Sequence, residues 1–100
     1  MVDYKNMFNL EGKRAVVVGG GGGIGGAIAE GFAAVGVKVA IVGRGLEKLQ
    51  KKADQIKADT GAEVVCLAGD MGNEADVARV CEEAKAALGG VDILVKIGRA

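Results

Sequence analysis

The chain has 100 residues with 13 basic and 13 acidic side chains, so its formal net charge is zero. This balance predicts no surface for nucleic acid or an anionic membrane, and three aromatic residues are too few for a base-stacking platform. No apolar run approaches the roughly 18 residues of a membrane span. We therefore expect one cytoplasmic domain over residues 1–100.

Several residue types that carry enzyme chemistry are missing. The sequence has no histidine and no serine, so it holds neither a Ser-His-Asp triad nor a histidine general base. No metal-ligand spacing occurs, and we expect no metal site. Cys66 and Cys81 lack CxxC spacing, which favours small buried apolar side chains in a reduced chain over a disulfide bridge.

The first half of the chain alternates between strand and helix patterns. Lys13–Val18 is a β-branched apolar run, typical of a strand buried on both faces. Helical spacing then predicts a helix over Ile24–Val35, with an apolar stripe of Ile24, Ala27, Ile28, Phe32 and Val35. Val37–Val42 predicts a second strand, and Leu46–Lys57 a second helix that ends before Gly61.

The second half continues the alternation. Residues 62–68 predict a third strand, and Glu74–Leu88 a third helix whose first N–H groups Asn73 caps. The apolar stripe of this helix consists of Val77, Val80, Cys81, Ala84 and Leu88. Gly89 stops the helix, and Val91–Val95 predicts a fourth strand.

Strands alternating with helices predict an α/β fold of three layers, a Rossmann-like parallel sheet of about four strands covered by three helices. Right-handed crossovers favour the strand order 3-2-1-4, and the flavodoxin-like order 2-1-3-4 is the alternative. In either order the loop after the first strand lies at the switch point, where such sheets bind ligands.

That loop is unusually rich in glycine. Seven of the eight residues from Gly19 to Gly26 are glycine. Glycines let backbone N–H groups approach a phosphate, and the following helix N-terminus favours an anion. A tight turn without a ligand is the alternative, but the position between a strand and a helix favours phosphate binding.

Combined motifs carry a family resemblance. The pattern GxxxGIG spans Gly19, Gly23 and Gly25, and the chain also contains "LEGKRAVV", "VGRGLEKL", "LAGDMGNEADV" and "GGVDILV". Together these strongly resemble the short-chain dehydrogenase/reductase family over about residues 8–95. The resemblance implies a Rossmann fold and NAD(P)-dependent oxidation or reduction of alcohols and carbonyls, of which this chain would form the cofactor-binding first part.

The resemblance also implies individual cofactor contacts. Gly19, Gly23 and Gly25 match the motif glycines, and Ile24 the hydrophobic residue between them. Asp70 matches the acidic residue that contacts the adenine ring, although a turn aspartate is the alternative. The chain departs from the family pattern with Val18 in place of threonine, and with Lys96-Ile97-Gly98 in place of Asn-Asn-Ala-Gly.

Charge at the end of the second strand predicts the cofactor. An NAD site normally places an acidic residue there, but this chain has Gly43 followed by Arg44. A guanidinium group binds a 2′-phosphate through paired donors, so we expect NADP rather than NAD. A solvated arginine at the start of a helix is the alternative interpretation of Arg44. Lys48, one turn further on, could add attraction, but a solvated helix face is the favoured interpretation.

No residue of this chain matches the family's catalytic Ser and Tyr-xxx-Lys, because Tyr4 is the only tyrosine and Phe8 follows it by four. We expect no hydride transfer by these residues unaided. The chain is then part of an oxidoreductase, a stand-alone nucleotide-binding module, or a half-fold that assembles with a partner.

Two further expectations follow. Valine at Gly19 or Gly23 should harm cofactor binding more than folding. The sheet face covered only by the helix Glu74–Leu88, and the edge at Val91–Val95, should promote self-association.

Overall fold

The computed structural model describes residues 10–19 and 21–97, which contain one sheet of four parallel strands. The strands are β1 (Arg14–Val18), β2 (Lys38–Gly43), β3 (Val64–Ala68) and β4 (Ile93–Lys96). They lie in the order β3-β2-β1-β4, which confirms the 3-2-1-4 prediction and excludes the 2-1-3-4 alternative.

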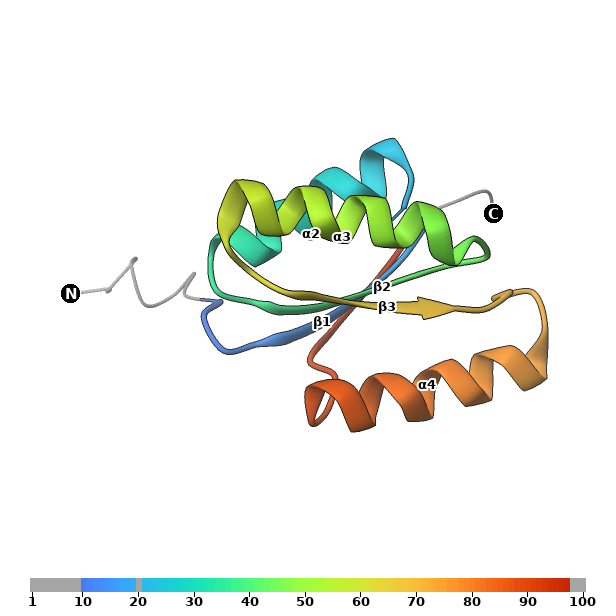
Figure 1. Cartoon of the computed structure of the whole chain (residues 1–100). Helices are drawn as coiled ribbons and strands as arrows, with labels where there is room; N and C mark the ends of the chain where they lie inside the picture. The colour runs from blue at the N-terminus through green and yellow to red at the C-terminus, as the bar shows by residue number, and fades with distance from the viewer. Residues whose placement is uncertain (1–9, 20, 98–100) are drawn as a thin grey trace.

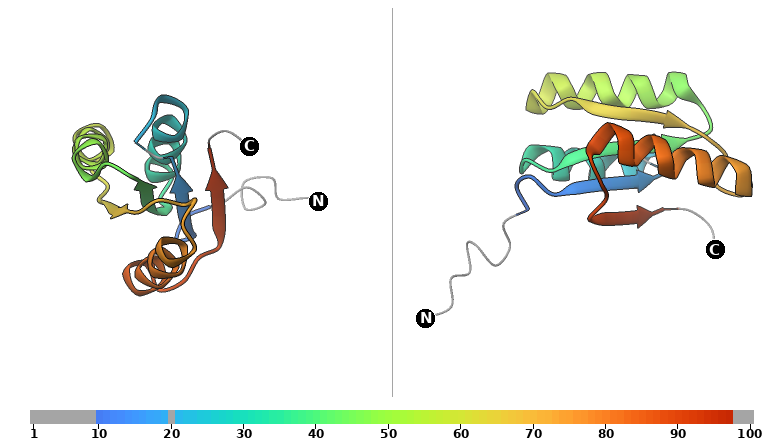
Figure 2. Two further views of the ribbon diagram at one scale, coloured as in Figure 1. Left: turned by 90° about the vertical axis from the view of Figure 1, so that its right-hand side faces the viewer. Right: turned by 90° about the horizontal axis from the view of Figure 1, so that it is seen from below.

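Three helices connect the strands. They are α2 (Gly23–Ala34), α3 (Leu46–Thr60) and α4 (Glu74–Leu88). α2 and α3 cover one face of the sheet, and α4 covers the other (Figure 1, Figure 2). This is the predicted three-layer arrangement, and within the described residues no helix is long and apolar enough to cross a membrane.

The core forms on both faces of the two central strands. Alternate side chains pack toward α2 and α3, and these are Ala15, Val17, Val39 and Ile41. The intervening side chains pack toward α4, and these are Val16, Ala40 and Val42. All seven are buried, which explains why β1 and β2 are continuous apolar runs rather than alternating ones.

The buried face of α2 differs from the predicted stripe. Ile24 and Val35 are 71% and 54% exposed, whereas the buried residues are Gly25, Gly26, Ala29 and Ala33. The prediction followed the large apolar side chains, but the distance between packed elements depends on the side chains at their contact. Glycine and alanine allow α2 to lie close to the sheet. Ile28 and Phe32 of the predicted stripe do pack against the same core cluster, although they are only partly buried.

Helix ends agree well with the sequence signals. Asn73 caps α4, because its Oδ1 accepts from the Ala75 and Asp76 backbone N–H groups at 2.9 and 3.2 Å. Gly61 and Gly89 follow α3 and α4 in the left-handed conformation, at φ 77° and 82°. That conformation strains other residue types, so glycine stops the helix there.

β4 begins later than predicted, at Ile93 rather than Val91. The Asp92 carboxylate accepts from both the Arg14 backbone N–H and its guanidinium, at 2.9 and 3.0 Å. Another Arg14 nitrogen donates to the Gly89 carbonyl at 2.8 Å. The Asp92 backbone N–H also donates to the Arg14 carbonyl at 2.8 Å. This cluster, called here the Arg14–Asp92 clamp, joins the end of α4 and the approach to β4 to β1.

Candidate functional site

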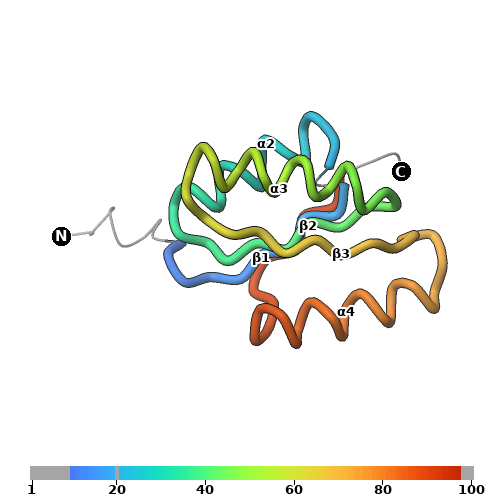
Figure 3. Tube along the Cα trace, in the orientation of Figure 1, coloured from blue at the N-terminus to red at the C-terminus, as the bar shows by residue number. Residues whose placement is uncertain are grey.

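The carboxyl ends of the strands meet at one edge of the sheet, where a cleft of about 470 Å³ opens. The loops that follow β1, β2 and β3 lie at this end, as Figure 3 shows. Its walls include Gly19, Gly43, Arg44, Asp70, Met71 and Lys96. Three residues predicted as cofactor contacts (Gly19, Arg44 and Asp70) therefore line one cleft, although they come from three different loops.

Gly19 lines this cleft and links the end of β1 to β2. Its backbone is left-handed at φ +89°, and its N–H donates to the Val42 carbonyl at 2.8 Å. A Cβ at Gly19 would lie 2.7 Å from the Ile97 carbonyl oxygen. A valine here would strain the fold itself, so Gly19→Val cannot separate an effect on binding from an effect on folding.

The other motif residues lie in the first turn of α2 and do not line the cleft. Gly25 is buried, whereas Gly23 is exposed and a Cβ on it would meet nothing within 4 Å. The N-terminus of α2 has no side-chain cap at Gly22 and no acidic residue in its first turn, in contrast to α4. It therefore keeps its positive dipole end without a protein carboxylate.

Arg44 follows β2 and lies exposed on the cleft wall. Within the part of the chain that the structure describes, its guanidinium forms no salt bridge or hydrogen bond. No acidic side chain from β2 competes for it, since Gly43 occupies the last position of that strand. The Arg44 guanidinium is thus a cation on the cleft wall that is available to an anionic ligand.

Asp70 has a structural role besides its place in the cleft. Its Oδ1 accepts from the Gly72 backbone N–H at 2.9 Å, and its own N–H donates to Asp76 Oδ2 at 2.8 Å. Asp70 therefore does stabilise a turn, as the alternative interpretation predicted, but it uses only one carboxylate oxygen for this. Among the described residues no donor reaches the other oxygen, so it is available to a ligand in the cleft.

Sequence reasoning missed Lys96 as part of the cleft. It is the last residue of β4 and pairs in register with Val18, the residue before Gly19. The signal was present, because all residues that end strands of a parallel sheet share one edge.

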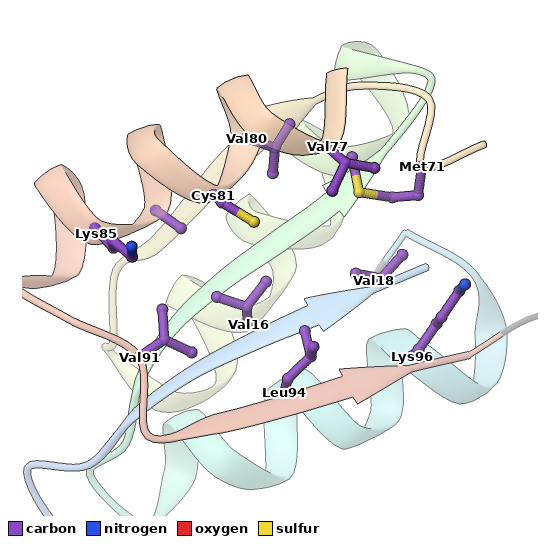
Figure 4. Close-up of a pocket in the computed structure, with 11 residues that line it drawn as sticks. Val16, Val18, Met71, Val77, Val80, Cys81, Lys85, Val91, Leu94 and Lys96 are labelled. Atoms are coloured by element: carbon purple, nitrogen blue, oxygen red, sulfur yellow. The ribbon is translucent and has the colours of Figure 1, made fainter. Parts of the chain in front are cut away.

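A second hollow, called here the apolar groove, lies between α4 and the face of β1 and β4 (Figure 4). It has a volume of about 320 Å³ and is lined by Val16, Val77, Cys81, Val91, Leu94 and others. Val18, Met71 and Lys96 line both hollows, so the groove adjoins the cleft.

The two cysteines only partly match their prediction. Both are free thiols, but Cys81 is exposed in the groove rather than buried. Cys66 is partly buried, and loss of hydration together with the Asp54 charge raises the pKa of its thiol. Raising the pKa keeps a thiol protonated, so Cys66 is poorly suited to act as a nucleophile.

A glycine turn after β1, a cleft at the switch point and helices on both faces define the Rossmann class of α/β folds.

The short chain dehydrogenase family matches residues 13–97. The chain is 39% identical over 88 residues to a short chain dehydrogenase of Pseudocercospora fijiensis, covering 88% of this chain and 28% of that protein. It is also 39% identical over 92 residues to glucose 1-dehydrogenase of Gluconobacter oxydans, covering 92% and 34% respectively.

Solved structures agree with these relatives. A short-chain type dehydrogenase/reductase from Mycobacterium marinum superposes with a TM-score of 0.86 at 32% identity, covering 93% of this chain and 37% of that one. L-sorbose reductase from Gluconobacter frateurii, solved with NADPH and L-sorbose, superposes with a TM-score of 0.85 at 37% identity, covering 92% and 35%.

The chain belongs to the short-chain dehydrogenase/reductase family, whose members are NAD(P)-dependent oxidoreductases. It spans between about a quarter and two fifths of the length of the relatives above.

Proposed function

We propose that this chain is the cofactor-binding part of a short-chain dehydrogenase/reductase that acts on alcohol or carbonyl substrates, with NADP preferred over NAD. The cofactor would supply or accept the hydride. The sequence offers no serine and only Tyr4 as tyrosine, so we expect no hydride transfer by these residues alone. A stand-alone nucleotide-binding module is the alternative, and we propose a cytoplasmic location for either.

The residues present fit a phosphorylated dinucleotide. The single observation that carries the proposal is that Arg44, which has no partner among the described residues, lies in the same cleft as Gly19. The loop from Gly19 leads into α2, whose first turn has no acidic residue. Phosphates bind at such helix ends and to guanidinium groups. Asp70 offers one carboxylate oxygen to an adenine amino group, which is a donor.

Calorimetric titration of the full chain with NADP and NAD tests this function. We expect tighter binding of NADP, and Arg44→Ala should weaken NADP binding by about ten- to a hundredfold, since a hydrogen bond to a charged group contributes about 1.5–3 kcal/mol. NAD binding should not change. Lys48→Ala is the matched control, a nearby exposed cation that does not line the cleft. Equal affinities for NADP and NAD in the wild type would contradict the cofactor assignment.

Gly23→Val tests the loop separately. A side chain at Gly23 enters open space in the protein, so the variant should melt within a few degrees of the wild type. It would obstruct a ligand at the start of α2, and we expect loss of dinucleotide binding. Normal binding by this variant would show that the glycine run is an ordinary turn.

We also propose that the chain self-associates through its α4 face. Leu94, Val91 and Val77 are 68%, 40% and 36% exposed, and all three line the apolar groove. β4 pairs only with β1 among the described strands, so its other edge is open. Open strand edges and contiguous apolar patches attract other chains.

A further inference from the structure

Lys96 has an unusual position among the charged residues of the cleft. It ends β4 beside Val18, and it lines both the cleft and the apolar groove. Figure 4 shows its side chain leaving the end of β4, with Leu94 on the same face of the strand. Lys96 thus lies where the two hollows meet, and a long charged side chain there can place its stem against the groove and its ammonium group in the cleft.

The ammonium group lacks a counterion within the described residues. No salt bridge or hydrogen bond joins Lys96 to any of them. Among the described residues that line the cleft, Asp70 is the only acidic one, and one of its oxygens accepts from the Gly72 N–H. With Arg44 and Lys96 against Asp70, the cleft carries a formal charge of +1.

The two cations stand on opposite sides of the glycine turn. Arg44 follows β2 and Lys96 ends β4, and β1 with Gly19 lies between these strands. Neighbouring strands lie about 4.8 Å apart, so the two backbone positions are separated by about 10 Å. Cations on either side of the turn can each bind a separate anionic group, and a dinucleotide with a 2′-phosphate and a pyrophosphate offers two such groups.

We propose that Lys96 is a second cationic contact for the cofactor and binds its pyrophosphate, while Arg44 binds the separate 2′-phosphate. This inference rests on the proposed function and assigns a different phosphate group of the cofactor to each cation. Lys96 strengthens NAD and NADP alike, since both contain the pyrophosphate. Arg44 distinguishes between them.

The test is calorimetric titration of the full chain with NADP, NAD and inorganic pyrophosphate. Lys96→Met removes the charge and keeps most of the apolar stem, so it preserves the groove. We expect it to weaken all three ligands by a similar factor of about tenfold, the value of one charge-assisted hydrogen bond. Lys96→Arg should restore most of the affinity. Lys85→Met is the matched control, because Lys85 lines the groove but not the cleft.

Different results separate this inference from the function on which it rests. If Lys96→Met binds NADP and NAD as the wild type does, Lys96 is not a cofactor contact, although the cofactor-binding function stands. If Lys85→Met weakens binding equally, the effect is general charge and the inference is overturned. If the folded wild type binds neither dinucleotide, the proposed function fails and this inference fails with it. Thermal melting of each variant establishes that it is folded.

Discussion

The two faces of the sheet are built differently. On one face, α2 and α3 enclose a core cluster of ten buried residues, with Leu49 and Ile56 of α3 at 1% and 0% exposure. On the other, α4 alone encloses seven and leaves the apolar groove open beside β4. The first is called here the covered face and the second the half-covered face.

This difference follows from the handedness of the connections. The crossovers from β1 to β2 and from β2 to β3 move in the same direction across the sheet, so right-handedness places α2 and α3 together. The crossover from β3 to β4 returns in the opposite direction and places α4 on the opposite face. One helix cannot cover four strands, which explains why the groove opens at the edge farthest from β3.

Large-to-small substitutions should give the largest difference in stability between the two faces. Leu49→Ala removes a side chain that is 1% exposed on the covered face, and we expect a loss of about 2–5 kcal/mol in the free energy of unfolding. Leu94→Ala on the half-covered face should change it by less than about 0.5 kcal/mol, because that side chain is largely exposed. Urea denaturation at low protein concentration measures both. Similar losses for the two variants would contradict the comparison.

Small-to-large substitutions should have the next largest effect. Ala29 is fully buried where α2 lies close to the sheet, so Ala29→Leu should cost about 1–3 kcal/mol through overpacking. Ala84 is equally buried on α4 but lines the apolar groove, which has room for the added carbons. We expect Ala84→Leu to be neutral or stabilising in the same denaturation experiment. A larger cost for Ala84→Leu than for Ala29→Leu would show that the groove cannot be filled.

Strand order and most helix ends were predictable because they depend on local or topological rules. Crossover handedness favours the 3-2-1-4 order, and only the structure excludes the 2-1-3-4 alternative. Asn73, Gly61 and Gly89 each act within a turn of their own position. The gathering of Gly19, Arg44 and Asp70 in one cleft was also predictable, since each follows a parallel strand.

Side-chain burial was less predictable because it depends on what lies opposite each helix. Ile24 belongs to a helical apolar stripe, but α2 turns its small residues to the sheet. Cys81 lines the apolar groove on the face that α4 alone covers among the described helices, so it remains exposed. Asp92 also bonds through its side chain to Arg14, which lies 78 residues earlier in the chain, and no strand propensity contains that contact.

Acid should affect the Arg14–Asp92 clamp, which joins α4 and β4 of the half-covered face to β1. Hydrogen bonds from the Arg14 guanidinium and backbone N–H lower the pKa of Asp92 from 3.8 to about 2. A lowered pKa in the folded state means that the stabilisation is present above the unfolded pKa and is lost as the pH falls through the folded value. Wild-type stability should therefore decrease between about pH 4 and about pH 2.

Asp92→Asn removes this titration and keeps an oxygen that accepts from the Arg14 N–H. The variant should be somewhat less stable than the wild type at neutral pH, and the difference should shrink toward about pH 2. Thermal melting across this pH range provides the comparison, and Asp59→Asn, an exposed residue of α3, is the control. A constant difference between wild type and Asp92→Asn at every pH would show that the charge of Asp92 contributes nothing.

The smallest expected effect on stability accompanies a change in self-association. Leu94 is 68% exposed on β4, so Leu94→Glu should leave the free energy of unfolding within about 0.5 kcal/mol of the wild-type value. The carboxylate would have to lose its hydration wherever another chain covers the groove, which is costly for an unpaired charge. Sedimentation velocity at several concentrations should then show a wild type that associates and a variant shifted toward monomer. Glu at Val35 is the control, because Val35 is 54% exposed at the end of α2, away from the groove.

If the wild type stays monomeric at every concentration, the half-covered face is stable in water and does not serve as an interface. If Val35→Glu prevents association as strongly as Leu94→Glu, the contact lies elsewhere on the molecule.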